Sequence, residues 1–96
     1  MKQIANAVIM YPDDNVVTAI TDLSKGEIVK YRVSDQWFEV SLIDNISFGH
    51  KLAVKEIKAF EPIIKYGENI GLATCDISAG EHVHVHNVDS VRGKGN

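Results

Sequence analysis

Four short segments of this 96-residue chain share one pattern, and this repeat constrains the fold more than any other feature. The pattern is an acid or amide, an aliphatic residue, two variable residues, glycine, a polar residue, a variable residue and a second aliphatic residue. We call this eight-residue segment the turn unit, and its copies are residues 22–29, 45–52, 56–63 and 76–83. In each copy we expect the aliphatic residues to anchor in the core and glycine to allow a turn with positive φ. Such repeated reversals are typical of a small β domain, and their irregular intervals exclude a solenoid.

The third turn unit departs from the pattern, because Phe60 occupies the glycine position. A bulky side chain is strained at positive φ. We therefore predict that this turn either uses another backbone geometry or displays the phenyl ring for a contact.

The remaining apolar residues occur in brief β-rich stretches, such as EIVKYRV, QWFEVSLI and PIIKY, separated by glycine, proline, aspartate or asparagine. Short stretches bounded in this way predict strands. Residues 15–24 are the one segment where helix and strand compete. At this length we predict one mostly β domain over residues 1–90, followed by a glycine-rich basic segment, 91–96, as a flexible tail or the start of a linker.

The charge and cysteine content exclude some function classes. The formal net charge is −3 and there is no run of lysine or arginine, so nucleic acid is not an expected partner. No apolar span of about 20 residues is present, so we expect no membrane partner. The single cysteine, Cys75, cannot form an internal disulfide, which favours a reducing compartment. The sequence predicts a cytoplasmic protein.

Three of the four histidines stand on alternate positions in GEHVHVHNV, at His82, His84 and His86. In a strand these side chains leave one face about 6.5 to 7 Å apart. Neighbouring pairs could share a metal ion, whereas His82 and His86 would lie about 13 Å apart at the backbone, too far to share one. From spacing alone, three hypotheses stay open: a polar strand face whose valines are buried, a metal or anion site, and a pH-sensitive interface.

Two other polar clusters are candidates for binding or catalysis. His50 and Lys51, after Gly49, place an acid/base group beside a fixed positive charge suited to a carboxylate. Lys65 and Tyr66, at a predicted turn, could contact an anion and donate a hydrogen bond. The structural alternative for His50 and Lys51 is a hairpin turn with two solvated side chains, and that for Tyr66 is a tyrosine packed at the edge of a turn.

Longer motifs give a more specific signal. The segments DNVVTAI (14–20), FGHKLAV (48–54), EPIIKYGENIGLA (61–73) and ISAGEHVHVHNV (77–88), followed by RGKG (92–95), closely resemble the N-terminal SAF domain of the altronate and galactarate dehydratase family. That family includes sulfolactate sulfo-lyase, in which the equivalent domain is a separate small subunit. Phe60 departs from the family pattern, and the stretch WFEVSLID is less similar to it.

The resemblance implies a β-clip fold and a role in a lyase. Members of the family eliminate water, or sulfite, from a hydroxy acid to give a 2-oxo acid, and they are associated with iron(II) or a similar divalent ion such as manganese. We therefore expect a sugar-acid or hydroxy-acid substrate, and a metal held only in the complete enzyme. The expected partner is a large catalytic subunit or C-terminal domain, without which this chain should be inactive.

The resemblance also assigns roles to the candidate residues. His50, Lys51, His84 and His86 are predicted to be catalytic, and His84 and His86, with His82 as the weaker member, to be metal ligands. Lys51 and Lys65 are expected to contact the substrate carboxylate, with Tyr66 beside them. A non-catalytic carbohydrate-binding or assembly module, including a structural clamp on a large subunit, is the alternative. The choice of hydroxy acid and the presence of a homo-oligomer are left open.

Overall fold

The computed structural model describes residues 3–90, and within that range the chain forms strands and turns without a helix. The mostly β prediction is confirmed, and the ambiguous segment 15–24 contains a strand. The segment predicted as a tail or linker, 91–96, lies outside the described residues. The strands of residues 3–90 are β1 (Ala7–Val8), β2 (Val16–Ala19), β3 (Ile28–Val33), β4 (Gln36–Ser41), β5 (Lys51–Ala53), β6 (Pro62–Lys65), β7 (Glu68–Ala73), β8 (His82–Val83) and β9 (Val88–Ser90).

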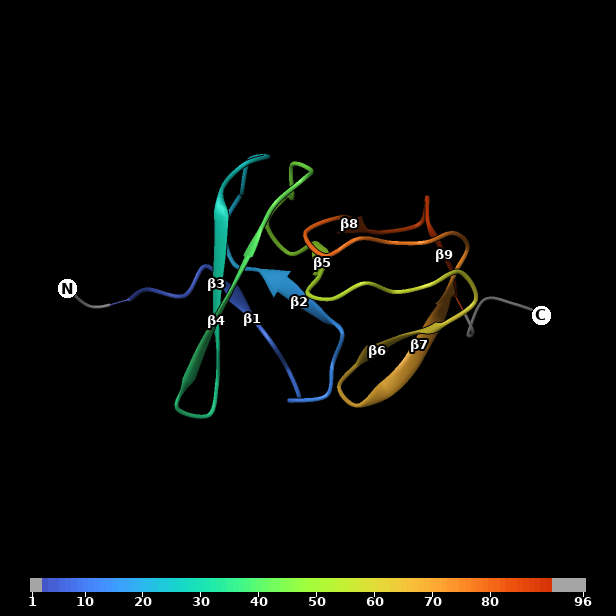
Figure 1. Cartoon of the computed structure of the whole chain (residues 1–96), viewed down its shortest axis with the longest axis horizontal. Coiled ribbons are helices and arrows are strands. Elements are labelled where there is room, and N and C mark those ends of the chain that lie inside the picture. Colours follow the sequence, from blue (N-terminus) through green and yellow to red (C-terminus); the bar gives the residue numbers. More distant parts are fainter. Residues whose placement is uncertain (1–2, 91–96) are drawn as a thin grey trace.

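The strands form three small antiparallel sheets. A central sheet has the order β1-β2-β5-β8, a separate hairpin joins β3 to β4, and a third sheet has the order β6-β7-β9. The β3–β4 hairpin lies at one end of the molecule and the β6–β7–β9 sheet at the other, with the central sheet between them (Figure 1). Segments distant in sequence therefore meet on the central sheet.

The central sheet separates two apolar cores. Val17 and Leu52 pack into the first core, whereas Val16 and Ala53, one residue away on the same two strands, pack into the second. This division follows from the alternation of side chains along a strand. The first core comprises Ala7, Val17, Ala19, Leu23, Val29, Tyr31, Leu42, Ile46 and Leu52. The second comprises Val16, Ala53, Ile57, Ile63, Ala73, Ile77 and Val83.

The four turn units associate as two pairs. Leu23 bridges to Ile46 and Ile57 bridges to Ile77, so the first unit pairs with the second and the third with the fourth. All four aliphatic residues are buried, which confirms them as core anchors.

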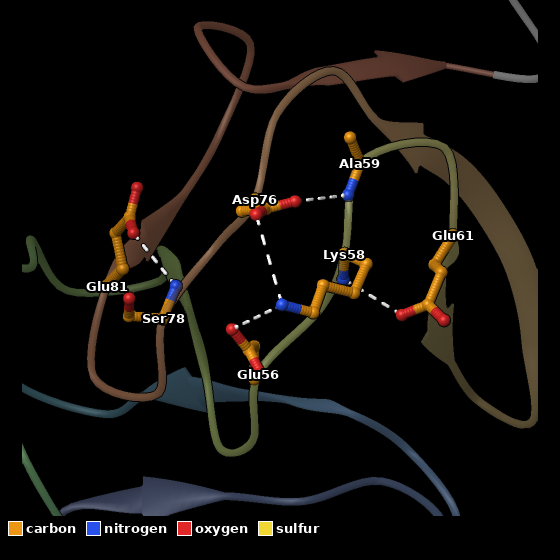
Figure 2. Close-up of polar contacts among 7 residues, drawn as sticks. All are labelled: Glu56, Lys58, Ala59, Glu61, Asp76, Ser78 and Glu81. Atoms are coloured by element: carbon orange, nitrogen blue, oxygen red, sulfur yellow. Dashed lines mark hydrogen bonds and ion pairs between the residues drawn. The ribbon is translucent and has the colours of Figure 1, made fainter.

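In three of the four turn units the acid or amide that opens the unit caps the unit opposite, whereas Glu56 of the third unit accepts from Lys58 Nζ at 3.1 Å within its own unit. Asp22 Oδ1 accepts a hydrogen bond from the Phe48 N–H at 2.8 Å, and Asn45 Oδ1 accepts one from the Lys25 N–H at 2.8 Å. In the other pair, Asp76 Oδ1 accepts from the Ala59 N–H at 2.9 Å (Figure 2). The polar opening position of the repeat therefore binds turn to turn across the pair.

Glutamate at the sixth position caps its own turn unit. Glu61 accepts from the Lys58 N–H at 2.8 Å and Glu81 from the Ser78 N–H at 2.9 Å, as Figure 2 shows. Glu27 makes the same bond to the Ser24 N–H in the first unit, at 3.0 Å. The second unit has His50 at this position, and its ring makes different contacts, described below.

Phe60 adopts the same backbone conformation as the glycines it replaces. Its φ is 71°, close to 84° at Gly49 and 87° at Gly80. The prediction of another turn geometry is therefore wrong, because the pairing of the two units fixes the backbone. Phe60 is 78% exposed, as the alternative expectation of a displayed phenyl ring requires, and the contact that the ring would make stays a prediction.

Candidate functional site

Three histidine rings converge at one edge of the central sheet. One nitrogen from each of His50, His82 and His84 lies within 4.8 Å of the other two. His50 Nδ1 is 3.0 Å from His82 Nε2, and the His50 and His84 rings stack with centroids 4.6 Å apart. We call these three residues the histidine trio.

Strand register brings the trio together from segments far apart in sequence. In the β5–β8 ladder Leu52 lies opposite His82 and Lys51 lies opposite Val83. One step further along the same register, His50 comes opposite His84. Residues opposite one another in an antiparallel pair share a face and lie within side-chain contact. The pairing of β5 with β8 therefore brings the imidazoles of His50, His82 and His84 close together.

The straight histidine row expected from the sequence is interrupted. Strand β8 ends at Val83, and the Asn87 N–H donates to the His84 carbonyl at 3.1 Å, closing a turn. The centroids of the His82 and His86 rings are consequently only 5.3 Å apart. The two rings are therefore closer than an extended chain would place them, but His86 does not belong to the histidine trio, and the expectation that His82 and His86 do not share a metal ion stays a prediction. Val83 is buried, but Val85 is 82% exposed, so only one of the two valines faces the core.

The trio differs in one member from the predicted set of metal ligands. His82 and His84 belong to it, whereas the third member is His50 in place of His86. His86 lies beside His82 with its ring tilted by 32°. All four histidines are therefore clustered, and the roles assigned to them stay predictions.

The environment of His82 favours its neutral form by lowering the pKa of the imidazole. Its partial burial lowers the pKa, and the neighbouring imidazoles His50, His84 and His86 lower it further, while the Asp44 carboxylate opposes the shift. A neutral imidazole offers a lone pair, which is the form required of a metal ligand.

A cavity of about 230 Å³ opens beside the trio. Its polar lining includes Lys51 and His84, so the cavity and the trio share one imidazole. Its other lining residues are Ile63, Ile70, Val83, Val85, Val88 and Ser90. The site therefore combines a cationic group with largely apolar walls.

Lys51 is the cationic group best placed to bind an anion. Burial lowers the pKa of its ammonium group, and the charge of Lys65 lowers it further. Neither lysine takes part in the ion pairs found within residues 3–90. An anion bound by Lys51 would offset both the desolvation and the repulsion from Lys65.

Tyr66 and Lys65 lie at the β6–β7 turn and do not line the cavity in the part of the chain described. The Tyr66 N–H donates to buried Asp14 at 3.0 Å, and its ring meets Tyr11 edge-on at 6.2 Å. Lys65 Nζ lies 5.4 Å from the centre of the Tyr66 ring. Tyr66 thus has a clear structural role, and its predicted contact with substrate stays a prediction.

The donor set fits a divalent transition metal. Imidazole nitrogens bind such ions at about 2.0 to 2.1 Å, which places two ligands of a tetrahedral ion about 3.4 Å apart. The 3.0 Å between His50 Nδ1 and His82 Nε2 and the 4.8 Å limit for the trio bracket that separation. Three imidazoles leave coordination positions open for another ligand, as catalytic metal sites do.

Comparison with known proteins gives the family. Residues 5–91 match the family model described as the altronate/galactarate dehydratase SAF domain. The chain belongs to this family. The resemblance seen in the motifs is therefore confirmed, and the absence of helix with several small antiparallel sheets agrees with the fold expected for an SAF domain.

Named relatives carry the SAF domain in two contexts. Altronate dehydratase from Bacillus subtilis (strain 168) is 44% identical over 78 residues, which cover 81% of this chain and 15% of that protein. Altronate dehydratase from Escherichia coli (strain K12) is 45% identical over 74 residues, 77% of this chain and 14% of the relative. The (2R)-sulfolactate sulfo-lyase subunit alpha from Chromohalobacter salexigens is 41% identical over 85 residues, 83% of this chain and 88% of that subunit.

This chain thus spans only a small fraction of the dehydratases that it matches, but nearly the whole of a sulfo-lyase subunit. An SAF domain of this family therefore occurs within larger lyases, either in a longer chain or as a subunit. Within residues 3–90, no helix has the length and hydropathy needed to cross a membrane.

Two residues that contact the histidine trio were not predicted from the sequence. Asp44 Oδ2 accepts from the His82 N–H at 2.9 Å, and buried Asn87 bonds to the backbone of both His82 and His84. The signal for Asn87 was present in the motif HVHVHN, because asparagine readily hydrogen-bonds nearby backbone and closes turns. Asp44 comes from a segment distant in sequence, and no local signal indicates its contact.

Proposed function

We propose that this chain is the SAF component of a lyase that removes water, or sulfite, from a hydroxy acid to give a 2-oxo acid, and that it completes an active site on a large catalytic polypeptide. A sugar acid such as altronate or galactarate is the proposed substrate. The observation that carries the proposal is the convergence of the histidine trio beside a cavity with a cationic wall. The dehydratase and sulfo-lyase names of the relatives support the reaction class.

The trio is the proposed metal site, with iron(II) as the expected ion and manganese as the alternative. When bound, such an ion supplies positive charge that stabilises developing negative charge on a substrate oxygen. His50, His82 and His84 would hold it.

The remaining groups bind the substrate and move protons. Lys51 attracts the carboxylate into the cavity, and Lys65 adds to the positive potential there. The aliphatic walls exclude water, which strengthens these electrostatic interactions. His86, outside the trio but beside His82, is the imidazole available to accept or donate a proton.

The exposed surroundings of the site favour completion by a partner. Val85, between His84 and His86, is 82% exposed, and Phe48, two residues before His50, is 67% exposed. Apolar side chains next to polar catalytic groups are typical of an interface. We therefore expect the chain to be inactive alone and to act in the cytoplasm within the complete enzyme.

The test combines the purified chain with its large catalytic partner and measures 2-oxo acid formed from altronate, galactarate and sulfolactate. Lys51→Met should lower kcat/KM by about tenfold or more, since a charged contact to the carboxylate is lost. Lys25→Met, at an exposed position of the first turn unit, is the matched control and should leave turnover unchanged.

A double variant, His84→Ala with His86→Ala, separates catalysis from assembly. We expect it to abolish turnover and reduce metal content while still forming the complex with the large chain. If turnover and metal content both stay at the wild-type level, the catalytic hypothesis is lost and the domain acts as a non-catalytic assembly module.

A further inference from the structure

Asn87 is one of the few buried polar residues of the described chain, and it is 1% exposed. Its Nδ2 donates to the His82 carbonyl at 2.8 Å, and its Oδ1 accepts from the His84 N–H at 3.0 Å. Its own carbonyl accepts from the Thr74 N–H at 2.9 Å. One carboxamide therefore joins the backbones of two members of the histidine trio. We call this two-bond arrangement a carboxamide clamp.

The same clamp occurs at two other places in the fold. Asn15 donates to the Pro62 carbonyl at 2.9 Å and accepts from the Ile64 N–H at 2.8 Å. Asn6 donates to the Ile28 carbonyl at 3.1 Å and accepts from the Lys30 N–H at 2.7 Å. In all three cases the clamped positions are the seventh residue of a turn unit and the residue two further on. The clamp is thus a recurrent way to hold the strand that leaves a turn unit.

The clamp on β8 closes the free edge of the strand that carries the histidines. The Glu81 carbonyl bonds to β5 through the Ala53 N–H. Because backbone groups alternate in direction along an antiparallel strand, those of His82 and His84 point away from β5. Asp44 accepts from the His82 N–H, the Asn87 carboxamide bonds to the His82 carbonyl and the His84 N–H, and the Asn87 backbone N–H donates to the His84 carbonyl. Side chains thus supply the hydrogen bonds that a further strand would otherwise make.

The clamp on β8 is also the most local of the three. Asn87 lies five residues after His82, whereas Asn15 lies 47 residues from Pro62 and Asn6 lies 22 from Ile28. To reach back to His82, the chain must turn after β8, and that turn brings the His86 ring to 5.3 Å from the His82 ring. In an extended strand their backbones would be about 13 Å apart. The hydrogen bonds of Asn87 that pair the backbone groups at the edge of β8 therefore also bring the His82 and His86 rings together.

We infer that Asn87 is a positioning residue for the histidine site: its carboxamide clamp fixes the relative placement of His82 and His84 and so sets the affinity of the trio for a divalent metal. The part that concerns metal affinity rests on the proposed function. The part that concerns ring placement stands on the hydrogen bonds alone.

The experiment compares Asn87→Ala with Asn15→Ala in the full 96-residue chain. Each substitution removes an equivalent clamp, so both should lower the denaturant midpoint, but only Asn87→Ala releases the histidines. Nuclear Overhauser contacts between the His82 and His86 rings, and between the His50 and His84 rings, should be lost in Asn87→Ala and kept in Asn15→Ala. If Asn87→Ala keeps these contacts, the inference is overturned.

Cobalt(II) titration of the chain in complex with its large catalytic partner, followed by visible absorption, tests the metal part, because the metal is expected only in the complete enzyme. Asn87→Ala should weaken binding by about tenfold or more and change the spectrum, as loss of groups that orient ligands does elsewhere. Asn15→Ala should stay within about twofold of wild type. Equal affinity and spectra in the two variants would overturn the role in metal affinity. Failure of the wild-type complex to bind cobalt(II), with ring contacts in the chain behaving as expected, would instead contradict the proposed metal site and leave the positioning role supported.

Asn87→Asp is the second variant, for use if Asn87→Ala does not fold. It keeps the acceptor for the His84 N–H but cannot donate to the His82 carbonyl. We expect the contact between the His82 and His86 rings to weaken while that between His50 and His84 persists. Retention of both contacts at wild-type intensity would overturn the inference.

Discussion

His50 and Glu81 occupy the same position in two copies of the turn unit, yet of these two side chains only that of Glu81 bonds to its own turn. The Glu81 carboxylate accepts from the Ser78 N–H at 2.9 Å, whereas the His50 ring lies against His82, with Nδ1 3.0 Å from Nε2. Glu27 and Glu61 follow the pattern of Glu81. The second turn unit therefore has, in place of a capping glutamate, a histidine whose ring belongs to the histidine trio.

This exchange predicts opposite effects on stability and on metal binding. His50→Glu should restore the cap and raise the free energy of unfolding by about 1 kcal/mol, while abolishing cobalt(II) binding by the trio. The reverse change at an equivalent position, Glu27→His, should lower stability by a similar amount without affecting the metal. Chemical denaturation of both variants, and metal titration of their complexes with the large catalytic chain, measure the two effects. Undiminished cobalt(II) affinity in His50→Glu would contradict the assignment of His50 to the trio.

A second prediction concerns two glycines with the same conformation and different surroundings. Gly26 and Gly80 have φ of 93° and 87°, but a Cβ at Gly26 would meet open space, whereas one at Gly80 would overlap the Ser41 carbonyl oxygen. Alanine should cost about 1 kcal/mol at Gly26 from backbone strain alone. At Gly80 it should cost at least about 2 kcal/mol more, because the neighbouring backbone must shift. Equal denaturant midpoints for the two variants would show that the backbone at Ser41 moves freely.

The sequence predicted the turn units but not how they associate. Their polar, aliphatic and glycine positions are local features, and all four aliphatic anchors are buried as expected. The pairing of the units depends on register between segments distant in sequence: Leu23 pairs with Ile46, and Ile57 pairs with Ile77. Local pattern carries no information about that choice.

The candidate site shows the same division between local and non-local information. The alternation of His82, His84 and His86 predicts a strand, but the Asn87 side chain competes for the backbone of this segment and turns the chain. The proximity of His50 to His84 arises only when β5 and β8 pair. A local clue to His50 existed, because histidine stands where the other turn units have glutamate.

A third prediction concerns alkaline pH. Tyr31 is 8% exposed, stacks on Phe38 with centroids 5.6 Å apart, and burial raises its pKa above the ordinary value of 10.0. Between these two pKa values the unfolded chain has lost the phenolic proton and the folded chain has kept it. The contribution of Tyr31 to stability is therefore present below pH 10 and is lost as the pH rises through the folded pKa.

Tyr31→Phe isolates this effect. Its free energy of unfolding should match that of wild type within about 0.5 kcal/mol at pH 7. Above pH 10, wild type should lose stability relative to the variant by up to about 1.4 kcal/mol per pH unit. The measurement is denaturation at a series of pH values between 7 and 11. Parallel stability curves for the two proteins would contradict the raised pKa.

The last prediction concerns Phe60, which holds positive φ with its ring 78% exposed. A bulky residue in this conformation costs about 1 to 2 kcal/mol of strain, which glycine does not incur, although glycine loses more backbone entropy on folding. Phe60→Gly should therefore raise the free energy of unfolding of the isolated chain by about 0.5 to 1 kcal/mol. If the ring is retained for a contact, the same variant should bind the large catalytic partner more weakly. Phe60→Asn separates the effect of backbone strain from the effect of losing the ring, because asparagine tolerates positive φ and has no phenyl ring. Lower stability in both variants would show that the ring packs within the domain.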